Sequence, residues 1–123
     1  MPVPRMTPED LKRRLDGAPD GKPHIVDVRL KYPYEHSTVT LPGAIRMAPE
    51  TLDVSRLSRE RDVVLYDSDP EELVSAAAAA ELLRLGFRAA ALSGGIAAWV
   101  AAKLPTDRKS APQPSAPLGS LKG

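Results

Sequence analysis

The segment VVLYDSDPEE, residues 63–72, gives the clearest indication of local structure in this chain. Its four apolar residues, Val63 to Tyr66, predict a short buried strand. A helix start follows, because Asp69, Pro70 and Glu72 have the order of a cap, a first-turn proline and a capping-box acid. A loop that joins a strand to a helix lies at the carboxyl edge of a sheet, where open α/β sheets bind ligands.

This loop is acidic. Asp67, Asp69, Glu71 and Glu72 place four carboxylates within six residues. The start of a helix offers unpaired backbone N–H groups and the positive end of the helix dipole, which suit an anion. We predict a binding site in the acidic loop of residues 67–75, made by Asp67, Ser68, Asp69, Glu71, Glu72, Leu73 and Val74.

The composition of the chain excludes several kinds of functional site and partner. The chain has 123 residues, enough for one domain with a real core. It has no cysteine, which excludes disulfides, zinc–thiolate sites and thiol nucleophiles. A net charge of +1 gives no reason to expect nucleic acid or an anionic membrane as a partner. Without an apolar run of about 18 residues or a secretory leader, we expect a cytoplasmic protein with no membrane contact.

The rest of the chain alternates helices and strands. Further strands are expected at residues 23–29, 44–47 and 88–92, and helices at 7–15, 49–52, 70–85 and 96–102, with a polar loop over 31–40. Thr7 is expected to cap the first helix, Gly86 to end the long helix and Trp99 to anchor the core. Asp27 and Arg29 share one face of a strand, where a structural charge pair is expected. The pattern predicts an α/β domain with a mainly parallel sheet and helices on both faces.

Several motifs resemble the rhodanese-like domain family. They are IVDVR at 25–29, LPGAI at 41–45, VLY at 64–66, LGF at 85–87, LSGGIAAW at 92–99 and LP at 104–105. The resemblance covers residues 6–105 and implies a three-layer α/β/α fold with a mainly parallel five-stranded sheet. The remaining residues, 106–123, are rich in proline and poor in large apolar side chains, so we expect a disordered tail.

The resemblance also implies a site. In rhodaneses a cysteine after the central strand accepts sulfane sulfur as a persulfide, and the backbone N–H groups of the next loop surround it. The matching position here is Asp67, and Asp69 matches a second cysteine found in one subgroup. The Gly-His pair that often precedes the LPGAI-type motif is Val39-Thr40 in this chain.

A carboxylate at this position argues against sulfur transfer. Carboxylate oxygen does not bear an S–S bond, and two like charges ~4 Å apart repel by about 4 kcal/mol at an effective dielectric of ~20. The same N–H groups would accept the carboxylate of Asp67 as a permanent mimic of the persulfide anion. We therefore expect a catalytically inactive binding or regulatory module, without cofactor or metal, whose acidic loop contacts an unknown, basic protein partner.

Parts of the sequence are compatible with three other functions. The first is a sulfurtransferase-related protein that works with a partner supplying the thiol. The second rests on Asp67-x-Asp69 after an apolar strand, which resembles the nucleophile motif of haloacid dehalogenase-type phosphatases, although no later acidic pair completes a magnesium site. The third is a hard-cation site, since Asp67, Asp69 and Glu71 alternate along the loop, but no glycine-centred calcium loop surrounds them.

Overall fold

The structure is a computed structural model that describes residues 3–17, 22–69 and 71–109. Its main sheet has five strands, all parallel, in the spatial order β1 (Arg5–Met6), β6 (Arg88–Leu92), β5 (Asp62–Tyr66), β2 (His24–Asp27) and β4 (Ile45–Arg46). A second, antiparallel pair joins β3 (Val39–Thr40) to β7 (Asp107–Arg108). The five-stranded, mainly parallel α/β fold is thus confirmed.

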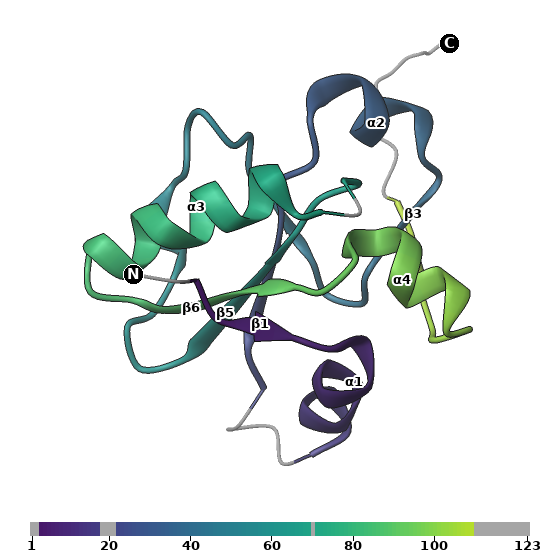
Figure 1. Cartoon of the computed structure of the whole chain (residues 1–123), viewed down its shortest axis with the longest axis horizontal. Helices are drawn as coiled ribbons and strands as arrows, with labels where there is room; N and C mark the ends of the chain where they lie inside the picture. The colour runs from purple at the N-terminus through teal and green to yellow at the C-terminus, as the bar shows by residue number, and fades with distance from the viewer. Residues whose placement is uncertain (1–2, 18–21, 70, 110–123) are drawn as a thin grey trace, which may run out of the picture.

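Helices cover both faces of the main sheet (Figure 1). Helix α3 (Leu73–Arg84) packs on one face, and α1 (Pro8–Asp16) and α4 (Gly95–Ala101) pack on the other. Along β5, Val63 and Leu65 join the core under α3, while Val64 and Tyr66 join the core under α1 and α4. Since successive side chains of a strand point to opposite faces, a strand that is covered on both sides has a continuous run of apolar residues in its sequence.

Two helix ends follow their expected chemistry. The Thr7 hydroxyl caps α1 by accepting the backbone N–H of Asp10 at 3.1 Å. Gly86 follows the end of α3 with a φ of +93°, and the next N–H, that of Phe87, returns to the carbonyl of Leu82 at 3.0 Å. This is a Schellman motif, and it turns the chain from α3 into β6.

The remaining connections differ from the sequence prediction. The segment 31–40 contains α2 (Lys31–His36) and β3, not only a loop. The brief helix expected at 49–52 is replaced by the 3₁₀ turn η2 (Val54–Arg56). Strand β1 was not predicted, because its two residues are too short for a periodic pattern and are held by pairing with β6.

The C-terminal boundary also extends further than predicted. Strand β7 pairs with β3, and the Lys109 N–H donates to the carbonyl of Thr38 at 2.8 Å, so the fold continues four residues past Pro105. The rest of the predicted tail, residues 110–123, lies outside the described residues. Within the described ranges, no helix combines the length and apolar character needed to cross a membrane.

Candidate functional site

Asp67 directly follows β5 and is almost fully buried, with 1% of its surface exposed. One carboxylate oxygen, Oδ1, accepts the backbone N–H of Asp69 at 2.9 Å, and the other, Oδ2, accepts that of Ser75 at 2.6 Å. Ser75 is the third residue of α3, so its N–H belongs to the first turn, which has no partner within the helix. Asp67 therefore caps α3 from eight residues upstream.

The backbone of Asp67 holds a second helix. Its carbonyl accepts the N–H of Ile96, near the start of α4, at 2.9 Å. Gly95 has a φ of +65°, and a Cβ placed there would lie 2.5 Å from the carbonyl oxygen of Asp67. Glycine is therefore needed at this position both for the backbone conformation and for the close approach of α4 to the loop.

Glu72 joins three elements. It precedes α3 in a left-handed conformation, with a φ of +58°. Its Oε2 accepts the N–H of Gly94 at 2.8 Å, and its Oε1 accepts Nε of Arg5, from β1, at 2.6 Å. The Gly94 N–H, followed by the Arg5 hydrogen bond and charge, lowers the pKa of Glu72 despite the opposing effect of burial. Both oxygens of this carboxylate thus have internal partners.

Asp69 does not cap α3 as predicted. The helix begins at Leu73, three residues later than the expected start at Pro70, which lies outside the described residues. Asp69 instead accepts the N–H of Glu71 on its Oδ1 at 2.8 Å, which closes a local turn. The prediction was wrong because Asp67, which was expected to be a ligand mimic, provides the cap in its place.

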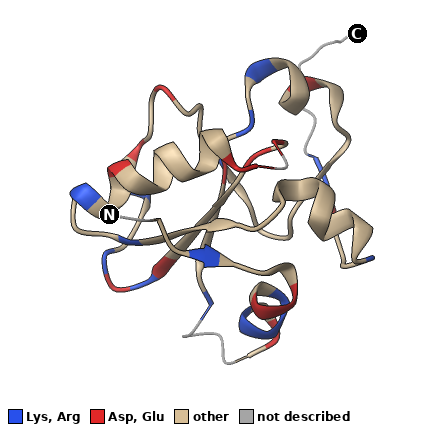
Figure 2. Cartoon of the chain, viewed as in Figure 1, with Lys and Arg blue, Asp and Glu red and all other residues tan. Residues whose placement is uncertain are grey.

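The predicted site residues divide into inward and outward groups. Figure 2 shows the acidic loop between β5 and α3. Of its four carboxylates, those of the buried Asp67 and the half-buried Glu72 each accept two hydrogen bonds from backbone or side-chain donors. Ser68, Glu71 and Leu73 are exposed, Leu73 to 65%, whereas Asp69 and Val74 are half-buried. The outer surface of the loop is therefore a small acidic and apolar patch, less acidic than the sequence suggests.

A buried ion pair lies beside this loop, at the ends of β2 and β5. Arg29 donates to Asp27 through Nε at 3.0 Å and through a terminal nitrogen at 2.7 Å, and both residues are 1% exposed. Burial alone would lower the pKa of Arg29, but the hydrogen bonds and charge of Asp27 raise it above its usual value. The expected structural role of the pair is supported, because its partners all lie within the fold.

Tyr66, the last residue of β5, completes this network. Its hydroxyl donates to Oδ2 of Asp27 at 2.9 Å and accepts the N–H of Leu41 at 3.3 Å. Burial, together with the negative charge of Asp27, raises the pKa of Tyr66, so the phenol stays protonated. The network fixes the carboxyl ends of β2 and β5 and hence the point from which the acidic loop departs.

The described residues contain no group of three or more His, Cys, Asp or Glu side chains that could hold a metal ion. In addition, both oxygens of Asp67 already accept N–H groups. This arrangement stabilises a carboxylate without a cation, and it does not favour the hard-cation reading of the loop.

Fold and site together define a class: a parallel α/β domain in which an anionic group after the central strand is surrounded by N–H groups of the following loop and helix. The chain belongs to the rhodanese-like domain family, whose family model matches residues 7–102. It lacks cysteine throughout, which is compatible with an inactive module. No curated protein matches the chain.

Solved structures agree with this family. The BH2092 protein of Bacillus halodurans is 27% identical with a TM-score of 0.74, and the alignment covers 86% of this chain and 77% of that one. A full-length protein of Lactobacillus plantarum is 25% identical with a TM-score of 0.74, over 85% and 88%. A thiosulfate sulfurtransferase of Pseudomonas aeruginosa is 25% identical with a TM-score of 0.69, over 86% of this chain but only 19% of that one.

Some residues of the site were not predicted from the sequence. Arg5 and Ser75 hold Glu72 and Asp67, but Arg5 and Glu72 are separated by 67 positions along the chain, so no local pattern shows their pairing. Gly94 and Gly95 were named only as part of the LSGGIAAW motif at 92–99. Two adjacent glycines before a helix are a signal for close backbone approach, and that signal was available.

Proposed function

We propose that this chain is a catalytically inactive rhodanese-like domain that acts as a binding or regulatory module in the cytoplasm. In this proposal Asp67 stands where the rhodanese pattern places its sulfur-carrying cysteine. One observation carries the proposal: the carboxylate of Asp67 accepts the loop N–H of Asp69 at 2.9 Å and the helix N–H of Ser75 at 2.6 Å. The chain's own anion occupies the cradle in which a persulfide would sit.

The chemistry of the occupant supports inactivity. A carboxylate is a hard oxygen group that cannot exchange sulfur, and it is held by two charge-assisted hydrogen bonds in a buried setting. The chain has no other thiol to take over the reaction. The loop around Asp67 is nevertheless held in place, since Glu72, Gly94 and Gly95 fix it against both neighbouring helices, α3 and α4.

The binding surface we propose is the outward part of the acidic loop of residues 67–75. Leu73 is the largest exposed apolar side chain there, and Ser68, Asp69 and Glu71 supply polar groups in the same loop. An apolar anchor within a polar rim is the usual composition of a protein interface. The two outward carboxylates favour a partner with basic side chains opposite them, which would contribute chiefly to association rate and specificity.

The test separates the surface from the scaffold. Binding partners captured from a lysate by the wild-type protein are compared with those of a triple variant, Asp69→Asn/Glu71→Gln/Leu73→Ala, which leaves Asp67 and Glu72 intact. A matched control is Glu81→Gln on α3, whose carboxylate pairs with the exposed side chain of Arg84. The proposal predicts that a partner retained by the control is lost by the triple variant. Equal retention by both variants would exclude the loop as the interface.

A second candidate is a sulfurtransferase-related protein that borrows a thiol from its partner. Its support is the family membership, together with the 25% identity of this chain to a thiosulfate sulfurtransferase that is much longer. It requires the partner's thiol to enter the cradle. That entry would displace the buried carboxylate of Asp67 from its two N–H donors, which makes it the less favoured of the two functions.

A further inference from the structure

A cavity of about 530 Å³ lies at the opposite edge of the sheet from the acidic loop. His24, which lines it, is the first residue of β2, and Arg61 immediately precedes β5. Asp67 follows the carboxyl end of β5, so in a parallel sheet the two places are separated by the length of the strands. The volume lies within the range of about 300–1,000 Å³ that is typical of small-molecule sites.

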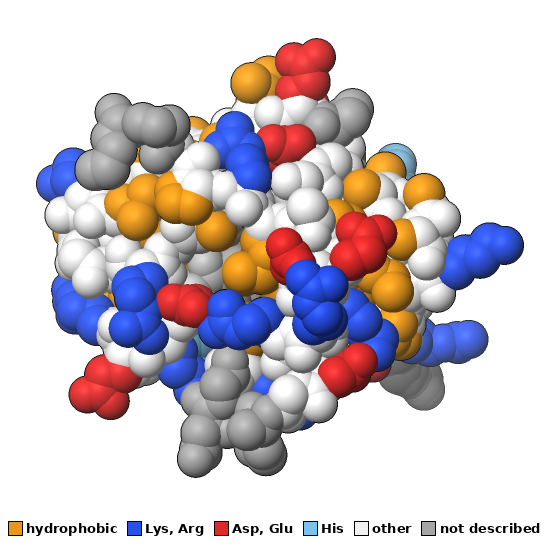
Figure 3. All heavy atoms as spheres, turned by 60° about the horizontal axis from the view of Figure 1, so that its bottom comes forward, with side chains coloured by type: hydrophobic (Ala, Val, Ile, Leu, Met, Phe, Trp, Pro, Cys, Tyr) orange, Lys and Arg blue, Asp and Glu red, His pale blue; other side chains and the backbone are white. Residues whose placement is uncertain are grey.

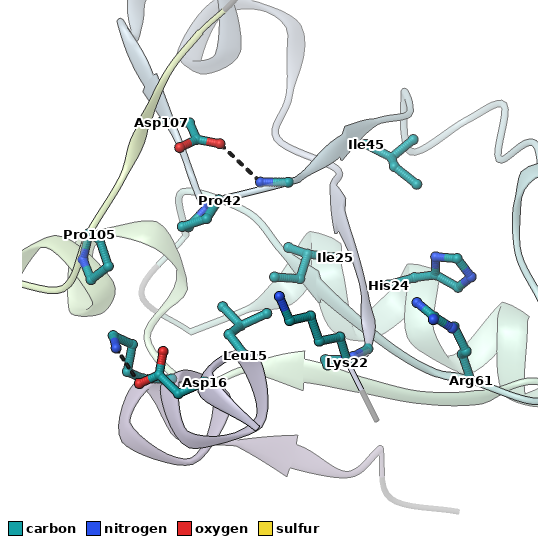
Figure 4. A pocket seen from close by; sticks show the side chains of 13 residues that line it. Leu15, Asp16, Lys22, His24, Ile25, Pro42, Ile45, Arg61, Pro105 and Asp107 are labelled. Atoms are coloured by element: carbon teal, nitrogen blue, oxygen red, sulfur yellow. Dashed lines mark hydrogen bonds and ion pairs between the residues drawn. The ribbon is translucent and has the colours of Figure 1, made fainter. Parts of the chain in front are cut away.

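The walls of this cavity combine apolar and charged side chains, and Figure 4 shows side chains from several parts of the chain meeting around it. Leu15 comes from the end of α1, Ile25 from β2 and Ile45 from β4, while Pro42 and Pro105 close other sides. The apolar part of these walls favours a ligand with an apolar body over a bare inorganic ion.

The acidic side chains that line the cavity already have partners. Asp16 forms an ion pair with Lys12 one helical turn away on α1. Asp107 accepts the N–H of Gly43 at 3.1 Å, as the dashed line in Figure 4 shows. Because both carboxylates already have a partner within the protein, neither of them favours a cationic ligand.

The basic side chains of the cavity differ from the acidic ones in this respect. Lys22 and Arg61 line it, and neither has a side-chain hydrogen bond or ion pair with any residue that the structure describes. His24 lies beside Arg61 in Figure 4, and its Nε2 is buried with no partner within those residues. Burial and the charge of Arg61 both lower the pKa of His24, so it is neutral at pH 7. The charged side chains of the cavity that have no described partner, Lys22 and Arg61, are therefore both cationic.

Charge and shape together specify the ligand. Three basic side chains, Lys12, Lys22 and Arg61, face two carboxylates, Asp16 and Asp107, which leaves one positive charge without compensation. We propose that this cavity is a binding site for a small monocarboxylate with an apolar body, whose carboxylate lies between Lys22 and Arg61 and whose body contacts Leu15, Ile25 and Pro42. This site is independent of the proposed function of the acidic loop.

The two histidines of the chain provide a direct measurement. His24 lines the cavity, whereas His36 is in α2 and does not. Their imidazole signals are followed by NMR during titration of the full chain with three probes: phenylacetate, its neutral analogue phenylacetamide, and acetate. Phenylacetate is expected to shift His24 and leave His36 unchanged, with a dissociation constant below about 10 mM, at least about 5-fold lower than for either other probe.

Saturation with phenylacetate is also expected to raise the pKa of His24, because the ligand's negative charge offsets that of Arg61. Lys22→Gln/Arg61→Gln should weaken phenylacetate binding by about 5-fold or more. Lys31→Gln, in α2, removes a lysine outside the cavity and should leave binding unchanged. Equal binding of phenylacetate and phenylacetamide, or no shift of His24 with phenylacetate up to about 10 mM, would overturn the proposal.

Discussion

Removal of the Asp67 carboxylate should destabilise the protein, because this group caps α3 from inside the fold. In Asp67→Ala the N–H groups of Asp69 and Ser75 both lose their acceptor. The Ser75 N–H is buried, and leaving one buried donor without a partner costs about 1–3 kcal/mol. The Asp69 N–H is only part-buried and can regain water, so its loss adds about 0.5–1 kcal/mol.

The expected total is a decrease of about 1.5–4 kcal/mol in the free energy of unfolding. Asp67→Asn keeps one acceptor oxygen but turns an NH₂ group toward the other donor, so about half of that loss is expected. The measurement is urea unfolding monitored by circular dichroism, with Ser68→Ala as control. Ser68 is the exposed neighbour of Asp67, and its variant should stay within about 0.5 kcal/mol of wild type. If Asp67→Ala were as stable as Ser68→Ala, the carboxylate would not be the cap that the geometry indicates.

Three further predictions concern the supports of the loop. Glu72→Gln should lower the free energy of unfolding at pH 7, because a carboxylate whose pKa is lowered on folding stabilises the folded state when it is ionised. The difference between the variant and the wild type should vanish as the pH falls through the lowered folded-state pKa of Glu72, and unfolding measured at several pH values checks this. Tyr66→Phe should cost about 1–2 kcal/mol in urea unfolding, since it removes a buried hydroxyl that donates to a carboxylate; an unchanged midpoint would contradict the network. Gly95→Ala should be far more destabilising in thermal unfolding than Gly43→Ala, because both glycines have a positive φ but only the Cβ at Gly95 would meet the Asp67 carbonyl; equal losses would show that backbone strain alone matters.

Much of the fold could be predicted from the sequence, because its strong signals are local. The apolar run at β5, the Thr7 cap and the Gly86 helix end each lie within a few residues and match the structure. Strand β1 and the β3–β7 pair were missed, because two-residue strands exist only through pairing with distant segments.

The place of the acidic loop after β5 was predicted, but the arrangement of its side chains was not. The sequence located the loop after β5 and its acidic residues, but capping rules assigned the helix start to Asp69. The actual cap, Asp67, acts across eight residues, and Glu72 is held by Arg5 from the far edge of the sheet. Such contacts depend on how the loop folds back on itself, which local propensity does not encode.

The most direct test of the central claim is a paired assay of the wild-type protein and Asp67→Cys. Both are measured for sulfur transfer from thiosulfate to cyanide and, by intact mass, for a bound sulfur atom. Because the N–H groups of Asp69 and Ser75 remain in place, the variant is expected to gain a sulfur adduct while the wild type shows neither activity nor adduct. Sulfur transfer by the purified wild-type chain would contradict the account.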